Sequence, residues 1–216
     1  MKLRGTFLPA VALLVAASLL VFLSGGCLGG SVSGTQERDA EDGARLAQEL
    51  AEHVQYVRDN ASRLASLIHG YINDERRAHG LRELQWDQQL AQIAYAHSKD
   101  MSDRDYFDHV SPEGKDFAAR YRENGYTRQT RVGDQVYVGG ENLFLNNVVA
   151  SYTFDQLSGE VLSYEFNDLE ELARSTVDGW MDSPGHRANI LTPFSREGIG
   201  IFVNGEGEVY ITENFS

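Results

Sequence analysis

The residue in this sequence best suited to chemistry is a histidine at the expected start of a helix. His186 follows Ser183-Pro184-Gly185, where serine is a preferred N-cap and proline a preferred first helical residue. The helix dipole favours the neutral form of a histidine near a helix N-terminus. Because a metal ligand or a general base needs a neutral imidazole, we expect His186 to present a reactive ring to a cleft.

A second histidine stands in a predicted loop. His109 follows a segment without sustained helical periodicity and precedes Ser111-Pro112-Glu113-Gly114, which is typical of a turn. Loop residues held by a rigid scaffold often carry function. His97 differs, because it falls on the apolar stripe of a predicted helix, where we expect a hydrogen-bonded core histidine rather than a ligand.

One carboxylate is a candidate partner for these rings. Glu141 follows Gly139-Gly140 and precedes an apolar run, so it is brought against a hydrophobic environment. A buried carboxylate needs a partner, and a histidine is the expected one. The alternative is a solvated glutamate at the end of a strand.

The elements that must position these residues are predicted from periodicity and turn signals. Asp87 is a predicted N-cap for a helix over residues 88 to about 104, directly after a tryptophan, Trp86, that we expect to be buried. A short helix around Phe117 and Tyr121, a polar loop over 127–134 and a strand edge over 135–138 follow. A further amphipathic helix ends near residue 182, with apolar-face residues Leu169, Leu172, Ala173, Thr176, Val177 and Trp180.

The chain ends in a predicted hairpin. Strand patterns over 198–203 and 208–212 flank Asn204-Gly205, a strong hairpin turn signal. Helices come first, a hairpin comes last, and no strand–helix–strand repeat occurs between them. This order predicts an α+β fold.

Several stretches, taken in order, resemble the CAP superfamily of cysteine-rich secretory, antigen 5 and pathogenesis-related proteins, in its prokaryotic, SCP-like form. The resemblance covers residues 62–215. It is carried by Ile72-Asn73-Asp74-Glu75-Arg76, Leu84-Gln85-Trp86-Asp87, Ala96-His97-Ser98-Lys99-Asp100-Met101, Tyr106-Phe107-Asp108-His109, Gly139-Gly140-Glu141-Asn142-Leu143, Trp180-Met181-Asp182-Ser183-Pro184-Gly185-His186-Arg187-Ala188-Asn189-Ile190-Leu191, Gly198-Ile199-Gly200 and Tyr210-Ile211-Thr212-Glu213-Asn214-Phe215.

The resemblance implies an α-β-α sandwich, in which helices flank a small central antiparallel sheet. It also implies a cleft of two histidines and two acids, three of which match His109, Glu141 and His186. The fourth position falls on Ser183, with Asp182 one residue earlier, so the second acid is missing or substituted. Two imidazoles and a carboxylate suit a divalent metal such as zinc, with His109 and His186 as the ligands and water completing the shell.

Composition limits the class of partner. The 216 residues carry 19 basic and 32 acidic side chains, a net charge of −13, which repels nucleic acid. A domain of this length can bury a sufficient core without disulfides. The single cysteine, Cys27, excludes a disulfide within the chain.

The N-terminus reads as an export signal. Lys2 and Arg4 precede an apolar run over residues 7–23, and small residues then lead to Cys27. This is typical of a signal peptide over 1–26 with a lipobox-like end and lipid attachment to Cys27, although Ser24 stands where a large aliphatic residue is usual. The alternative is an uncleaved anchor helix. Both place the domain outside the cytoplasm, anchored to the outer face of the cell membrane.

The rest of the chain divides into three predicted parts. Residues 27–43 form a flexible tether, residues 44–61 an additional N-terminal helix and residues 62–216 the CAP domain. The additional helix serves as a spacer or a dimerising element, and Gly70 is a possible interruption of the helical pattern that follows. Residues 147–165 form an insertion that covers the cleft or lies outside it.

Three functions from different classes fit these observations. The first is a membrane-tethered binding module with a metal-capable cleft for an unidentified small molecule, lipid or protein. The second is an envelope scaffold with a purely structural His–Glu network, and the third is a metal-dependent peptidase or esterase. The sequence lacks a His-Glu-x-x-His motif, a serine nucleophile elbow and any thiol other than Cys27, so it favours a non-enzyme.

Overall fold

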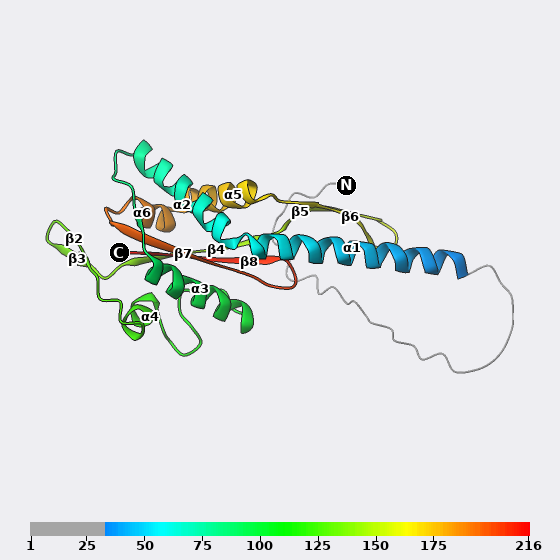
Figure 1. The fold of residues 1–216 in the computed structure, drawn as a ribbon, viewed down its shortest axis with the longest axis horizontal. Coiled ribbons are helices and arrows are strands. Elements are labelled where there is room, and N and C mark those ends of the chain that lie inside the picture. Colours follow the sequence, from blue (N-terminus) through cyan, green and yellow to red (C-terminus); the bar gives the residue numbers. More distant parts are fainter. Residues whose placement is uncertain (1–32) are drawn as a thin grey trace.

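A computed structural model describes residues 33–216 of the chain (Figure 1). The predicted signal segment and the predicted lipid-attachment residue, Cys27, lie outside the described residues. Among residues 33–216, no helix is both long enough and apolar enough to cross a bilayer.

A central sheet of four strands organises the domain. Its order is β1 (Gln85–Trp86), β7 (Arg196–Val203), β8 (Glu208–Phe215) and β4 (Gly140–Asn147). The two-residue β1 runs parallel to β7, and the other neighbours are antiparallel. The predicted terminal hairpin is therefore confirmed as β7–β8. The predicted small antiparallel sheet is also confirmed, with the short β1 as a parallel addition at its edge.

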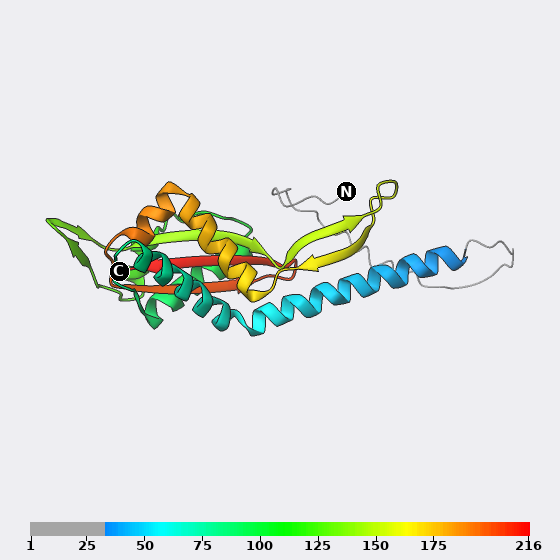
Figure 2. The same cartoon turned by 90° about the horizontal axis from the view of Figure 1, so that it is seen from above.

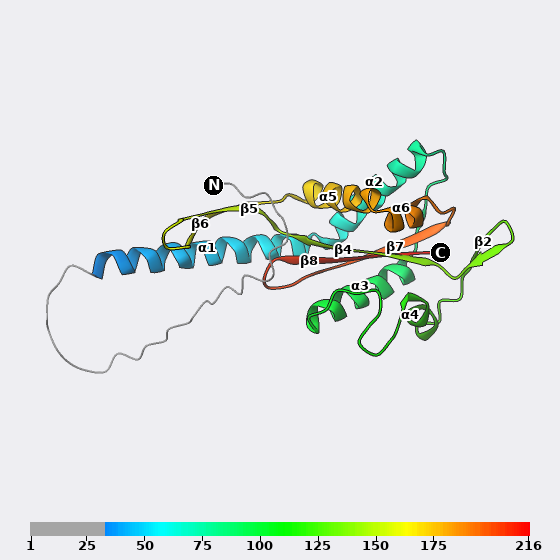
Figure 3. The same cartoon turned by 180° about the vertical axis from the view of Figure 1, so that it is seen from behind.

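Helices cover both faces of this sheet. The helices α3 (Gln88–Asp103) and α4 (Phe117–Glu123) lie on one side, and α2 (Ala61–Ala78), α5 (Leu169–Asp182) and α6 (Pro184–Leu191) lie on the other (Figure 3). The predicted α+β fold and α-β-α sandwich are confirmed.

Close backbone approach explains why α3 packs directly on β7. A Cβ atom at Gly198 would collide with the backbone of Ala91, and one at Gly200 would collide with the backbone of Tyr95. The predicted N-cap also exists, because the Asp87 side chain accepts hydrogen bonds from the backbone N–H groups of Gln89 and Leu90. Trp86, however, is 37% exposed rather than buried, because β1 is the outermost strand of the sheet.

The main core lies between the sheet and the layer of α2, α5 and α6. All six residues predicted to form the apolar face of α5 are buried. Trp180 has no exposed surface, and its Nε1 donates to the carbonyl oxygen of Leu143 at 2.9 Å. This bond and its packing fix the end of α5, from which the candidate histidine segment departs.

The N-terminal helix α1 (Ser33–Asp59) differs from prediction at both ends. It begins inside the predicted tether 27–43. The sequence of that part has no apolar period, so it gave no helical signal. Arg45 pairs with Asp42 and Glu49 at the spacing that supports a solvated helix. The break before α2 falls at Asn60, and the helix continues through Gly70, which was considered as a point of interruption.

The insertion forms a second hairpin, β5 (Val149–Phe154) and β6 (Val161–Phe166), which runs beside α1 (Figure 2). His53 of α1 stacks on Phe166 at 4.3 Å between ring centroids and bonds the backbone oxygen of Asn167 at 3.0 Å. The apolar stripe of α1, which includes Leu46 and Val54, is buried within this chain. The stripe is therefore already covered in the monomer, which favours the spacer over the dimerising element.

The hairpin β5–β6 leaves the end of β4 that is remote from Glu141, so the insertion lies outside the candidate cleft (Figure 2). At the opposite end of the molecule, the segment 127–138 forms a short hairpin, β2 (Thr130–Val132) with β3 (Gln135–Tyr137). Part of the predicted polar loop is thus a strand.

Candidate functional site

The loop between α3 and α4 carries His109, as predicted. The turn after it is closed by a bond from the Gly114 N–H to the Ser111 carbonyl oxygen at 2.8 Å. Arg120 of α4 donates from Nη2 to the His109 carbonyl oxygen at 3.1 Å, which holds the loop against the helix. The His109 side chain is 48% exposed, so one edge of its ring faces solvent.

Glu141 lies in β4 and is buried, with 1% of its side chain exposed. The predicted histidine partner is present, because His109 Nδ1 lies 3.0 Å from Glu141 Oε1. Arg120 Nη2 also donates to both carboxylate oxygens of Glu141, at 2.9 and 2.6 Å. The carboxylate is therefore paired with an arginine as well as a histidine, and the solvated alternative is wrong.

His186 lies in the first turn of α6, which begins at Pro184 as predicted. Its ring centroid is 6.2 Å from that of His109, so folding brings the two imidazoles together. Burial and, next, the neighbouring His109 lower the pKa of His186, which favours its neutral form. Neutrality was expected from the helix dipole, but desolvation is its main cause.

His97 behaves as the predicted core histidine. It is 2% exposed, and its Nε2 bonds the Asp108 carbonyl oxygen at 3.1 Å. Burial lowers the pKa of His97. Its Nε2 is 4.0 Å from Glu141 Oε1, so it lines the inner wall of the site without a hydrogen bond to the carboxylate.

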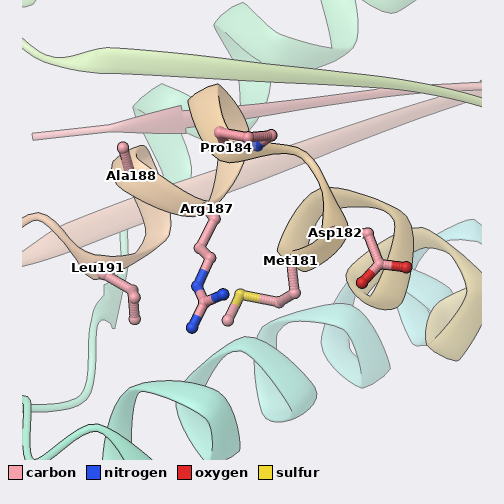
Figure 4. Close-up of a pocket in the computed structure, with 6 residues that line it drawn as sticks. All are labelled: Met181, Asp182, Pro184, Arg187, Ala188 and Leu191. Carbon is pink, nitrogen blue, oxygen red and sulfur yellow. The ribbon is translucent and has the colours of Figure 1, made fainter.

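The two positions considered for a second acid lie at the junction of α5 and α6. Asp182 lines a shallow pocket with Met181, Pro184, Arg187, Ala188 and Leu191 (Figure 4). None of the three residues His109, Glu141 and His186 lines that pocket. Ser183 occupies the N-cap of α6, but its side chain makes no capping bond.

The fit to a metal rests on the two histidines. Two imidazoles that share a zinc ion, each about 2.1 Å from it, have centroids roughly 5 to 6 Å apart. The observed 6.2 Å is close to this separation. The described residues contain no group of three or more histidine, cysteine or acidic side chains arranged to hold a metal ion. A metal here would therefore need exogenous ligands in addition to His109 and His186.

Sequence reasoning missed the residues that support the site. Asn142 Nδ2 donates to the His186 carbonyl oxygen at 3.2 Å, and Asn189 Nδ2 donates to the Glu141 carbonyl oxygen at 3.1 Å. The missed arginine carried a signal: Arg120 lies three residues after Phe117 and one before Tyr121, both on the packed side of α4. A charge on an apolar helix face implies a buried partner.

Comparisons with known proteins agree with this architecture. The sequence model of the Cysteine-rich secretory protein family (CAP) matches residues 69–215, well over half of the chain. The chain is 28% identical over 141 residues to the uncharacterized membrane protein YlbC of Bacillus subtilis (strain 168), covering 65% of this chain and 30% of that protein. It is 31% identical over 134 residues to the uncharacterized protein YkwD of the same strain, covering 62% of this chain and 40% of that one.

Two solved structures are similar. An extracellular protein containing an SCP domain from Bacillus anthracis str. Ames aligns with a TM-score of 0.50 at 29% identity, covering 71% of this chain and 40% of that one. An outer surface protein from Borrelia burgdorferi aligns with a TM-score of 0.50 at 12% identity, covering 71% and 91%. The chain matches under half the length of both Bacillus subtilis relatives. From the family match and the fold, this chain belongs to the Cysteine-rich secretory protein (CAP) family.

Proposed function

We propose that this chain is an extracytoplasmic binding module, tethered to the membrane through its N-terminus, with a cleft in which His109 and His186 hold a divalent metal such as zinc. The unidentified ligand, a small molecule, lipid or protein, would complete the coordination. The observation that carries the proposal is the meeting of His109, Glu141 and His186 from three separate segments of the chain.

The hydrogen bond between His109 and Glu141 supports a ligand role for the histidine. An ionised carboxylate only accepts, so His109 Nδ1 donates the proton in this bond. The lone pair then resides on Nε2, and nearly half of the side chain is exposed. A carboxylate behind a histidine orients the ring and raises its basicity as a ligand.

The Arg120 contact favours binding over hydrolysis. A general base must lie within hydrogen-bond reach of the proton that it abstracts. Arg120 Nη2 contacts both oxygens of Glu141, and the carboxylate is nearly inaccessible. Glu141 is therefore better suited to orient His109 than to activate water.

The arrangement of the ends supports a tethered module. The start of α1 and the segments that carry the cleft lie at opposite ends of the molecule (Figures 1 and 2). The sequence before α1 reads as a lipoprotein signal or anchor, and relatives are described as a membrane protein and as extracellular. Attachment at the start of α1 would thus hold the cleft away from the membrane.

The proposal is tested by calorimetric titration of the full-length chain, in detergent, with zinc. Wild type is expected to bind one zinc ion, and both His109→Ala and His186→Ala are expected to lose that binding while remaining folded. His79→Ala is the control, because His79 is an exposed histidine at the C-cap of α2, where its Nδ1 bonds the Glu75 carbonyl oxygen and its Nε2 lies 3.5 Å from Arg187 Nη2, outside the His109–Glu141–His186 site. Absence of zinc binding by the wild type would contradict the metal site and leave the structural scaffold.

A panel of peptides and esters tests the enzyme alternative. The binding proposal predicts no zinc-dependent turnover. Turnover abolished by Glu141→Gln, with zinc still bound, would instead support a hydrolase.

A further inference from the structure

A pair of buried acids lies on the opposite face of the sheet from Glu141. Glu197 of β7 and Glu213 of β8 have no exposed surface. Glu213 pairs with Ile199 of β7, and Glu197 lies two residues before Ile199. Because side chains two residues apart on a strand point to the same face, both acids lie on one face of the sheet as diagonal neighbours. Folding thus brings two carboxyl groups together in the core, where two negative charges are costly.

The hydrogen bonds of this cluster are incomplete if both acids are ionised. Glu213 Oε2 accepts from Asn142 Nδ2 at 3.0 Å, and Glu197 Oε1 bonds His69 Nδ1. The remaining oxygens, Glu197 Oε2 and Glu213 Oε1, are buried and lack a donor among the described residues. Two ionised carboxylates can only accept, so neither of these oxygens can gain a partner from the other acid unless one carboxyl group carries a proton. One proton supplies the missing donor.

Among the described residues, no cationic side chain donates a hydrogen bond to Glu213. The cation that would be expected to balance the acids is Arg76 of α2. Its guanidinium instead donates to the carbonyl oxygens of Arg82, Ile190, Thr192 and Phe194. His69 of α2 bonds Glu197 through Nδ1 and Asn73 through Nε2, so neither ring nitrogen is available to Glu213. The groups that face the acid pair are therefore His69, Arg76 and the amide of Asn142, and none of them contributes a hydrogen bond to both acids.

We propose that Glu197 and Glu213 share one proton at neutral pH, and that Glu213 in this state positions His186 through Asn142. The Asn142 amide donates both to Glu213 Oε2 and to the His186 carbonyl oxygen, at 3.0 and 3.2 Å. Its Oδ1 accepts from Asn189 Nδ2 at 2.9 Å, which fixes the orientation of the amide. Glu213 is thus a positioning residue for the candidate site, although it lies on the opposite face of the sheet from Glu141.

The shared proton gives the stability of the domain a defined pH dependence. Burial, and next Glu197, raise the pKa of Glu213 well above its ordinary 4.5. Above pH 4.5 the unfolded chain releases this proton, whereas the native state still holds it. The stability contribution is complete below pH 4.5 and is lost as the pH rises toward the native pKa.

Thermal unfolding of the full-length chain from about pH 5 to about pH 8 tests the shared proton. Glu213→Gln keeps a carbonyl acceptor for Asn142 and supplies a permanent N–H donor for Glu197. The unfolding midpoint of the wild type is expected to fall more steeply with pH than that of Glu213→Gln. Glu206→Gln, in the exposed β7–β8 turn, should keep the wild-type slope. Equal slopes for wild type and Glu213→Gln would overturn the proposal.

Infrared spectroscopy gives a direct second measurement. The carbonyl stretch of a protonated carboxyl is expected in the wild type at neutral pH and is expected to be absent from Glu213→Gln. Persistence of this band in the variant, or its absence from the wild type, would overturn the shared proton.

The positioning role is read from the His186 ring by nitrogen–proton NMR. Glu213→Gln should leave the His186 resonances in place, whereas Glu213→Leu should shift them. If Glu213→Leu does not fold, Asn142→Ser removes the bridging amide and is expected to produce the same shift. Unchanged His186 resonances in the folded variant would overturn the positioning role. None of these measurements uses metal, so they can fail or succeed independently of the zinc titration.

Discussion

The domain contains two histidine–glutamate pairs, one on each face of its central sheet. His109 and Glu141 meet on the side of α3 and α4, and His69 and Glu197 meet on the side of α2. Both carboxylates are almost completely buried, but the His109 side chain is 48% exposed and that of His69 only 25%. The two pairs have the same chemistry but different access to solvent.

The pairs also differ in what balances the carboxylate charge. Arg120 neutralises Glu141 directly, and an arginine keeps its charge at every relevant pH. Glu197 lies beside a second acid, Glu213, so that a proton replaces the arginine. The comparison indicates that the first pair has an arginine partner and a histidine that faces outward, whereas the second pair lies in the core beside another acid.

The largest expected effect comes from removing the arginine of the first pair. Arg120→Met leaves the Glu141 carboxylate buried without its cation, which should cost about 3–5 kcal/mol in the free energy of unfolding. Urea denaturation measures this cost. Arg122→Met is the control, because Arg122 is exposed on the same helix. Equal stabilities for the two variants would show that Arg120 does not neutralise Glu141.

The next largest effect is on zinc affinity, which should depend on the solvent-exposed pair, His109–Glu141, and not on the pair in the core, His69–Glu197. Glu141→Gln removes the carboxylate that orients His109, so zinc should bind roughly 10–100-fold more weakly. Glu197→Gln alters the other pair and should leave the zinc affinity unchanged. Calorimetric titration gives both constants, with circular dichroism to verify folding. Equal weakening in both variants would contradict a role specific to the first pair.

A smaller effect distinguishes the pairs by pH. The hydrogen bond to Glu197 raises the pKa of His69 above its ordinary 6.5. This pair therefore stabilises the native state fully below pH 6.5, and the contribution is lost as the pH rises through the native pKa. His69→Gln should cost roughly 1 kcal/mol at acidic pH and less at alkaline pH. Denaturation at both pH values checks this, and a larger cost at alkaline pH would reverse the assignment.

The smallest effect is expected at the exposed histidine. His109→Gln removes a half-exposed partner from Glu141, while Arg120 continues to neutralise the carboxylate. The free energy of unfolding should change by less than about 1 kcal/mol. Thermal unfolding without metal tests this expectation. A loss comparable to that of Arg120→Met would mean that His109 stabilises the buried carboxylate as much as Arg120 does.

Local chemistry explains which parts of the fold were predictable. The cap at Asp87, the turn at Asn204-Gly205 and the apolar face of α5 depend on residues near one another in sequence. The helical start of α1 was missed because a solvated helix needs no apolar stripe, and Trp86 was misjudged because an outermost strand cannot be recognised from two residues.

The candidate site was predictable only in part. Resemblance to a known family indicated His109, Glu141 and His186, and the structure brings the first two into contact with the third ring nearby. Arg120 remained hidden because its partner lies in another element, and pairs of opposite charge are too common in sequence to identify a contact. The Glu197–Glu213 pair was equally hidden, since burial of both depends on strand register.

By itself, the sequence determined the starts of α3 and α6, the apolar face of α5, the terminal hairpin and the residue types available for chemistry. The tertiary structure alone decided which carboxylate received an arginine and which received a second acid. The physical reason is that capping and periodicity act over a few residues, whereas the energy of a buried charge depends on every group that folding places around it.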